Sequence, residues 1–335
     1  MTPASSRFRH SIHLLTAALL LSLVQSVCAA GWETVRYNGN DYVTLRSIKS
    51  FYRFDTMKRA GNKVVLENKV VEMRLTVGGQ EVWMNNVKFV FSFPVVARSG
   101  RYLVSRIDLA KMIDPVLRPK YIRPARPIST IIIDPGHGGK DPGTVNRYGN
   151  EKDYNLQVAR KLKAELEKLR VFKVVMTRDT DKYLTLSQRV AIANKYSNAL
   201  FISIHFNSGG RRGGAAEGIE TFTLSPVGVA HYGRGLKSSD FEARTGNSQD
   251  SANVALATAV HSNVLLMSGR PDRGIRRARY SVLTGVKHPA VLLEGGFMSH
   301  HFESRLINND AYQTTLAKAM AKAVVKYKVA TERQR

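Results

Sequence analysis

An apolar strand that stops in a glycine-rich turn constrains this chain more than any other feature of its sequence. Residues 131–133 are three isoleucines, and Asp134-Pro-Gly-His-Gly-Gly follows them, so that His137 stands between glycines. Glycine lets the backbone adopt positive φ and approach a ligand closely, and open α/β sheets bind ligands at the carboxyl ends of their strands. A phosphate-binding loop is the alternative, but no Gly-Lys-Ser/Thr sequence closes the turn. The segment therefore predicts a strand-end site that uses an imidazole.

A second strand predicts another histidine at the same edge. Residues 199–203 read as a buried strand and lead directly into His205. A lone histidine in such a place is more often structural, whereas two strand-end histidines indicate a metal. Glu151 begins the helix that follows the His137 turn, so we expect its carboxylate to project back toward that turn. Two histidines and a glutamate with an open fourth position match a catalytic zinc site.

A third strand, residues 290–293, ends in Glu294, which two glycines follow. Beside a metal, a carboxylate at this place can take a proton from the attacking water and pass it to a leaving nitrogen. Considered alone, Glu294 could equally cap a turn or pair with an arginine.

Strands alternate with longer amphipathic helices over this part of the chain, which predicts an α/β fold. The strands are expected at 130–134, 172–177, 199–203, 219–224 and 290–293, and the helices at 151–170, 186–196, 251–267 and 309–329.

The N-terminal third has a different pattern. Short alternating segments with polar breaks at residues 31–113 predict a small β-rich α+β domain with two short helices, at 45–52 and 104–113. Four prolines in the following stretch predict an extended connector. The expected organisation is a signal peptide at 1–30, a stalk or targeting domain at 31–113, a proline-rich linker at 114–128, a catalytic domain at 129–329 and a tail at 330–335.

The first thirty residues predict a secretory signal and thus a periplasmic or cell-wall location. Arg7 and Arg9 precede an apolar run at 12–24, which is shorter than the roughly 20 residues that span a bilayer. A membrane anchor is one alternative. A lipoprotein built on Cys28, the lone cysteine, is another, but Gln25 and Val27 fit that processing poorly.

The formal net charge of +25 indicates polyanionic surroundings. Nucleic acid is the usual partner of such a charge, but no helix-turn-helix, zinc-finger or RNA-binding signature accompanies it, and export would separate the chain from the chromosome. An anionic wall or lipid surface fits better. The alternative is that a high pI is common among the exported proteins of the organism and indicates no particular partner. Whether a partner protein activates the chain stays open from the sequence.

Taken together, the segments resemble the zinc-dependent N-acetylmuramoyl-L-alanine amidases, which cut the bond between muramic acid and L-alanine in peptidoglycan. The resemblance covers about residues 129–327 and rests on Asp134-Pro-Gly-His-Gly-Gly, Glu151, Thr177-Arg-Asp, Leu186-Ser-Gln-Arg189, Ala193-Asn194, Ser203-Ile-His205-Phe-Asn207, Gly218-Ile-Glu-Thr-Phe222, Arg273-Gly-Ile and Pro289-Ala-Val-Leu-Leu-Glu-Gly-Gly-Phe. It implies a mixed twisted sheet flanked by helices, one Zn²⁺ held by His137, Glu151 and His205, and Glu294 as the catalytic acid/base. The N-terminal domain loosely resembles the stalk-type domain of copper amine oxidases.

This chain differs from the family pattern at two places, and two other functions are alternatives. The family commonly has Asn where this chain has His300, with His301 beside it, and some members carry a regulatory helix over the zinc that is not evident in residues 225–269. For substrate binding we expect Asn207 to meet a peptide carbonyl, and Arg276 or Arg277 to meet a stem-peptide carboxylate. We expect Arg189 to anchor its helix to a loop. A zinc peptidase acting on wall stem peptides and a non-catalytic wall-binding protein are the alternative functions.

Overall fold

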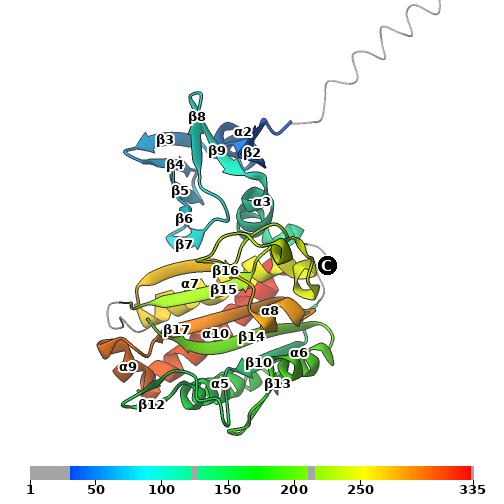
Figure 1. Ribbon diagram of the computed structural model, residues 1–335, viewed down its shortest axis with the longest axis vertical. Coiled ribbons are helices and arrows are strands. Elements are labelled where there is room, and N and C mark those ends of the chain that lie inside the picture. Colours follow the sequence, from blue (N-terminus) through cyan, green and yellow to red (C-terminus); the bar gives the residue numbers. More distant parts are fainter. Residues whose placement is uncertain (1–30, 123–126, 210–215, 333–335) are drawn as a thin grey trace, which may run out of the picture.

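The computed structural model describes residues 31–122, 127–209 and 216–332 (Figure 1). The predicted signal peptide and the last three residues of the predicted tail lie outside the described residues. Within the described part of the chain, no helix has both the length and the apolar character needed to cross a membrane.

A mixed central sheet forms the larger half of the molecule and confirms the predicted α/β fold. Its strands, in spatial order, are β13 (Lys173–Met176), β10 (Thr130–Pro135), β14 (Ala199–Asn207), β17 (Ala290–Phe297), β15 (Ile219–Leu224) and β16 (Asp272–Ala278). The first four are parallel to one another, and β15 runs antiparallel to β17 but parallel to β16. The carboxyl ends of β10, β14 and β17 therefore meet at one edge, as the sequence predicted.

Helices cover both faces of this sheet (Figure 1). Ile131 and Ile133 belong to the hydrophobic core shared with the long helices α5 (Glu151–Glu167), α7 (Asp250–Ser268) and α10 (Asp310–Thr331), whereas Ile132 belongs to a second core with residues of the short helices α6 (Leu186–Asn194) and α8 (Ser281–Gly285). Alternate strand residues point to opposite faces of a sheet, so three consecutive isoleucines join both layers. A further short helix, α9 (His301–Ile307), and a two-stranded hairpin of β11 (Val145–Asn146) and β12 (Gly149–Asn150) lie beside the sheet edge.

The N-terminal part is β-rich, as predicted, and it extends the central sheet. One small sheet contains β1 (Thr34–Tyr37), β2 (Asn40–Thr44), β9 (Arg101–Ser105) and β8 (Val96–Arg98), with helix α2 (Leu45–Phe51) after β2. A meander of β3 (Thr56–Ala60), β4 (Lys63–Glu67), β5 (Glu72–Thr76), β6 (Glu81–Met84) and β7 (Val87–Val90) follows. β7 pairs with β16 through Phe89 and Ile275, so the meander and the central sheet form one sheet of 11 strands.

The segment that joins the two parts differs from the sequence-based expectation. Helix α3 (Arg106–Asp108), a π-helical turn (Leu109–Ile113), helix α4 (Asp114–Leu117) and a 3₁₀ turn (Pro119–Tyr121) follow one another. The prediction of an extended connector is wrong for residues 114–121. Pro115 is the second residue of α4, and its fixed φ suits a helical conformation.

Candidate metal centre and catalytic cavity

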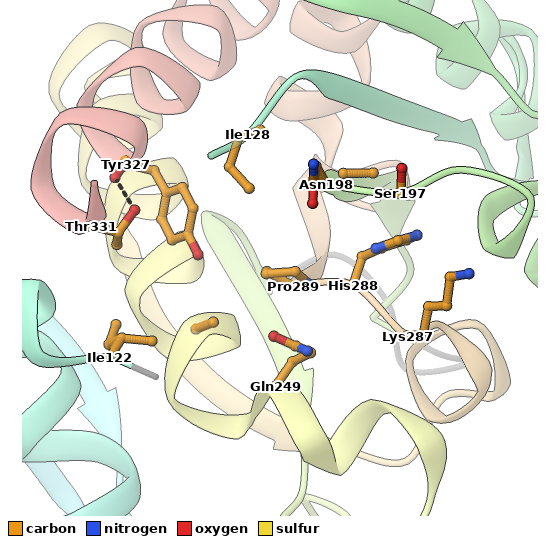
Figure 2. A pocket seen from close by; sticks show the side chains of 12 residues that line it. Ile122, Ile128, Ser197, Asn198, Gln249, Lys287, His288, Pro289, Tyr327 and Thr331 are labelled. Carbon is orange, nitrogen blue, oxygen red and sulfur yellow. Dashed lines mark hydrogen bonds between the residues drawn. The ribbon is translucent and has the colours of Figure 1, made fainter. Parts of the chain in front are cut away.

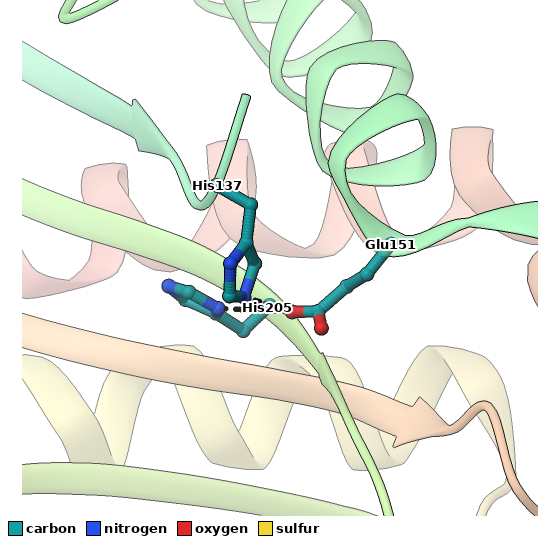
Figure 3. A group of neighbouring side chains, drawn as sticks. All are labelled: His137, Glu151 and His205. Carbon is teal, nitrogen blue, oxygen red and sulfur yellow. Dashed lines mark hydrogen bonds and ion pairs between the residues drawn. The ribbon is translucent and has the colours of Figure 1, made fainter. Parts of the chain in front are cut away.

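Three side chains converge at the carboxyl edge of the central sheet. Figure 3 shows His137 from the turn after β10, Glu151 from the start of α5 and His205 from β14 pointing toward one another. Glu151 Oε1 lies 3.2 Å from His137 Nε2 and 3.0 Å from His205 Nδ1. One ligand atom from each residue falls within 4.8 Å of the others, a spacing that can hold a metal ion. The structure thus brings together the three residues predicted as ligands.

Glycines make room for this convergence. A Cβ on Gly136 would overlap the imidazole ring of His205, and a Cβ on Gly143 would lie 2.6 Å from Glu151 Oε2. His137 itself has a φ of 59°. Non-glycine residues in this left-handed region are uncommon, and they concentrate at functional sites where the surroundings impose the conformation.

We expect Gly136→Ala to displace His205 and to lower metal content severely, because the added methyl would occupy the space of the ring. Gly235→Ala is the matched control, since nothing lies within 4 Å of its added Cβ. Metal bound per chain, measured on purified protein by elemental analysis, distinguishes the two variants. Full metal content in Gly136→Ala would show that metal binding does not need the space that Gly136 leaves for the His205 ring.

Hydrogen bonds orient the converging groups. His137 Nδ1 lies 2.8 Å from Asp141 Oδ2, so the carboxylate of Asp141 fixes the orientation of the ring. The backbone N–H of Thr144 donates to Glu151 Oε2 at 3.0 Å. Histidine ligands of metals usually donate their other ring N–H to a carboxylate or carbonyl. The donor set, two imidazole nitrogens and a carboxylate oxygen, therefore fits a divalent transition metal.

The carboxylate of Glu151 is held in its ionised form. Burial alone would raise its pKa, but hydrogen bonds from His137 and His205 outweigh burial and hold the pKa of Glu151 well below its usual range. Burial favours the neutral form of His137, yet Glu151 and Asp141 together raise the pKa of His137. The negative charge of Glu151 that favours protons on the two imidazole rings would equally favour a metal cation bound between them.

Two buried arginines fix the backbone that carries His137. Arg189 donates to the carbonyls of Pro135 and His137 at 2.7 and 2.6 Å and pairs with Asp134 at 2.8 Å. Arg178 donates to the carbonyls of Pro135 and Gly136 at 3.0 and 2.8 Å. Burial, together with the charge of Arg189, lowers the pKa of Arg178 to about 10. The predicted anchoring role of Arg189 is confirmed.

Glu294 lies next to the cluster, within β17, which continues three residues beyond it to Phe297 instead of ending there as predicted. It stands beside His205 in the β14–β17 register and beside Glu220 in the β15–β17 register. Its side chain is almost fully buried, and its Oε2 has no hydrogen-bond partner among the described residues. Burial and the charges of Glu151 and Glu220 raise the pKa of Glu294 well above its usual range. A carboxyl group in this state can hold and release a proton.

A cavity of 570 Å³ opens over these groups. It is lined by Asp134, Gly136, His137, Asp141, Tyr183, Leu184, Leu186, Arg189, His205, Arg279, Tyr280, Ser281, Val282, Leu292 and Glu294. A smaller cavity of 310 Å³ (Figure 2) is lined by Ala199 and Pro289, near the starts of β14 and β17, and by none of His137, Glu151, His205 and Glu294. The larger cavity is therefore the one that meets the candidate metal ligands.

Glu220 is a central polar residue of the site that sequence reasoning did not single out. Its Oε2 accepts from Asn207 Nδ2 at 2.9 Å, and its Oε1 pairs with Arg273 at 2.7 Å and with Arg276 at 2.8 Å. The only signal was its place in Gly218-Ile-Glu-Thr-Phe222. Asn207 and Arg276 were both predicted to bind substrate. In the structure their side chains contact the buried carboxylate of Glu220 instead.

The structure places Arg277 elsewhere. It is 4% exposed and donates to the carbonyl of Lys111 at 2.6 Å, at the contact with the N-terminal part. This position does not support the predicted role in substrate binding.

His300 caps α9, and His301 lies 2.6 Å from an Arg305 nitrogen. Neither joins the metal-ligating group. The α-helix within residues 225–269 is α7, which packs against α10 and β15, and none of its residues lines the cavity.

Comparisons with known proteins agree with this geometry. The profile of a family described as N-acetylmuramoyl-L-alanine amidase matches residues 131–326. The N-acetylmuramoyl-L-alanine amidase AmiC of Escherichia coli O6:H1 is 30% identical over 243 residues, which are 66% of this chain but only 58% of AmiC. Among solved structures, the catalytic domain of the amidase CwlV from Bacillus (Paenibacillus) polymyxa var. colistinus matches with a TM-score of 0.50 and 32% identity, over 60% of this chain and 98% of that one. AmiC2 of Nostoc punctiforme matches with a TM-score of 0.50 and 30% identity, over 59% and 96%.

Proposed function

Because this chain belongs to the N-acetylmuramoyl-L-alanine amidase family, we propose that it hydrolyses the amide bond between N-acetylmuramic acid and L-alanine of peptidoglycan in a zinc-dependent reaction. The observation that carries the proposal is the group of His137, Glu151 and His205, of which the two histidines line one cavity together with Glu294.

His137, Glu151 and His205 would hold the zinc ion. Their atoms are two imidazole nitrogens and one carboxylate oxygen, and the two histidines line the cavity. When bound, zinc lowers the pKa of water toward neutrality and polarises a carbonyl oxygen. Asp141 keeps the His137 ring in the orientation that ligation needs.

Glu294 would carry the proton. Its carboxyl group lines the cavity and can accept a proton from the attacking water. The same carboxyl can then deliver that proton to the nitrogen of L-alanine as the amide bond breaks. Its raised pKa favours the protonated form that this delivery requires. Asn207 and Arg276 would act on substrate indirectly, by fixing Glu220 beside Glu294.

The parts of the chain outside the cavity suggest where the enzyme works. We assign residues 129–329 to catalysis and residues 31–113 to spacing or targeting on the wall, with 114–128 between them. The signal-like sequence of residues 1–30 and the charge of +25 support export to a periplasmic or cell-wall location with anionic surroundings.

Mass spectrometry of digested peptidoglycan tests this function. We expect the protein without residues 1–30, the predicted signal peptide, to release intact stem peptides with a free L-alanine amino terminus. A zinc chelator should abolish this release, and added zinc should restore it. Cleavage inside the stem peptide would identify a zinc peptidase instead. Binding to the wall without any cleavage, with or without zinc, would identify a non-catalytic protein.

A further inference from the structure

Two apolar side chains at the mouth of the catalytic cavity face solvent. Tyr183 is 41% exposed and Leu186 is 53% exposed, and both line the cavity that contains His137 and Glu294. Exposed apolar side chains scattered over a surface need no explanation, but a group of them beside a cleft marks a binding site. Their neighbour Leu184 is buried and continues the same wall into the cavity.

The segment that carries this wall is fixed against the histidine turn. A Cβ on Gly139 would lie 2.8 Å from the backbone nitrogen of Tyr183, so only glycine permits the two segments to lie so close. Gly139 N–H donates to Asp181 Oδ1 at 2.7 Å, and Lys152 Nζ donates both to the Gly139 carbonyl at 3.0 Å and to Asp181 Oδ2 at 2.6 Å. Tyr183 is therefore presented at a set position relative to His137, as a substrate contact requires.

A positive charge stands on the same rim. Lys140 Nζ lies 4.7 Å from the centre of the Tyr183 ring, and the side chain is exposed. Within the described residues Lys140 forms no ion pair with a carboxylate. A cation–π contact at an exposed site is weak, so the ammonium group remains available to an anionic ligand.

We infer that Lys140, Tyr183 and Leu186 form a subsite that binds the stem peptide of the substrate. The inference rests on the proposed function, because that function supplies a substrate with a neutral glycan on one side of the scissile bond and a carboxylate-bearing peptide on the other. An apolar wall suits the methyl group of alanine, and the ammonium group of Lys140 suits a peptide carboxylate. The neutral glycan offers no partner for that charge.

The test compares two soluble substrates, an N-acetylmuramoyl peptide with free carboxylates and the same compound with those carboxylates amidated. For the free acid, we expect Lys140→Ala to raise KM about fivefold and Tyr183→Ala to raise it about tenfold, with little change in kcat. For the amidated compound, the effect of Lys140→Ala should disappear while that of Tyr183→Ala remains. Calorimetric binding of the released peptide should weaken in parallel, and this readout does not depend on turnover.

Lys120→Ala and Tyr121→Ala are the matched controls. Lys120 Nζ lies 5.4 Å from the ring of Tyr121, also on the surface but outside the catalytic cavity. Both variants should behave as the parent. If the parent cuts the muramoyl–alanine bond but the Lys140 and Tyr183 variants keep its KM for the acid, the subsite is wrong and the function stands. If the parent cuts another bond, the proposed function fails whatever the variants do. Equal losses on the acid and amidated substrates in Lys140→Ala would assign the rim to the glycan and overturn the inference.

Discussion

Replacing Glu294 by glutamine should reduce amide hydrolysis by about 10²–10⁴-fold, the usual contribution of a positioned acid–base group. Glutamine keeps the size and burial of the side chain, but it cannot accept a proton from water or deliver one to the departing nitrogen. His137, Glu151 and His205 are untouched by the change, so metal content should remain that of the parent. Release of stem peptides measured by mass spectrometry, together with elemental analysis of zinc, checks both parts.

Glu242→Gln controls for the loss of a carboxylate as such. Glu242 pairs with Arg244 on the surface, with its side chain 61% exposed, and its replacement should leave hydrolysis unchanged. Near-parental activity in Glu294→Gln would remove Glu294 from the chemistry. Loss of zinc from that variant would instead mean that Glu294 helps to form the metal site.

Replacing Arg189 by alanine should destabilise the protein by about 3–5 kcal/mol, because it leaves a buried charge without its partner. The Arg189 and Asp134 side chains are 3% and 1% exposed. Asp134 would keep only the hydroxyl donors Thr177 Oγ1 at 2.6 Å and Ser203 Oγ at 2.9 Å. The His137 carbonyl would also lose its donor, so zinc affinity should fall together with the melting temperature.

Denaturant unfolding and a zinc titration check this second expectation. Arg244→Ala is the control, because its pair with Glu242 is exposed and such pairs contribute about 0–1 kcal/mol. An Arg189→Ala protein that unfolds at the denaturant concentration of the control would show that the buried pair does not hold the histidine turn.

The group of His137, Glu151 and His205 was predictable because these residues stand at recognisable places along the chain. His137 and His205 each end an apolar run, and parallel strands bring such ends to one edge of a sheet. Glu151 followed from its place at the start of a helix. These are local signals combined with one rule of topology, and the structure agrees with them.

The residues that support the site were not predictable in the same way. Strand β16 contains three arginines in seven residues and has no apolar run. It becomes a strand because β15 and β7 pair with it on either side. Glu220 is a buried carboxylate, and its burial is tolerated because the partly buried Arg273 and Arg276 pair with it. Pairings of this kind depend on which strands become neighbours, and a single sequence does not display that.

The backbone pairing between β7 and β16 limits how the N-terminal domain can move. Phe89 faces Ile275 across the seam, and the N–H of Lys88 donates to Asp272 at 2.8 Å. A domain on a flexible linker would sample many orientations and could reach bonds over a wide radius. This one is joined through a continuous sheet, so a change in its orientation relative to the cavity would have to break the pairing between Phe89 and Ile275. If the N-terminal domain binds the wall, as we propose, that pairing restricts the distance between the bound wall and the bond that enters the cavity.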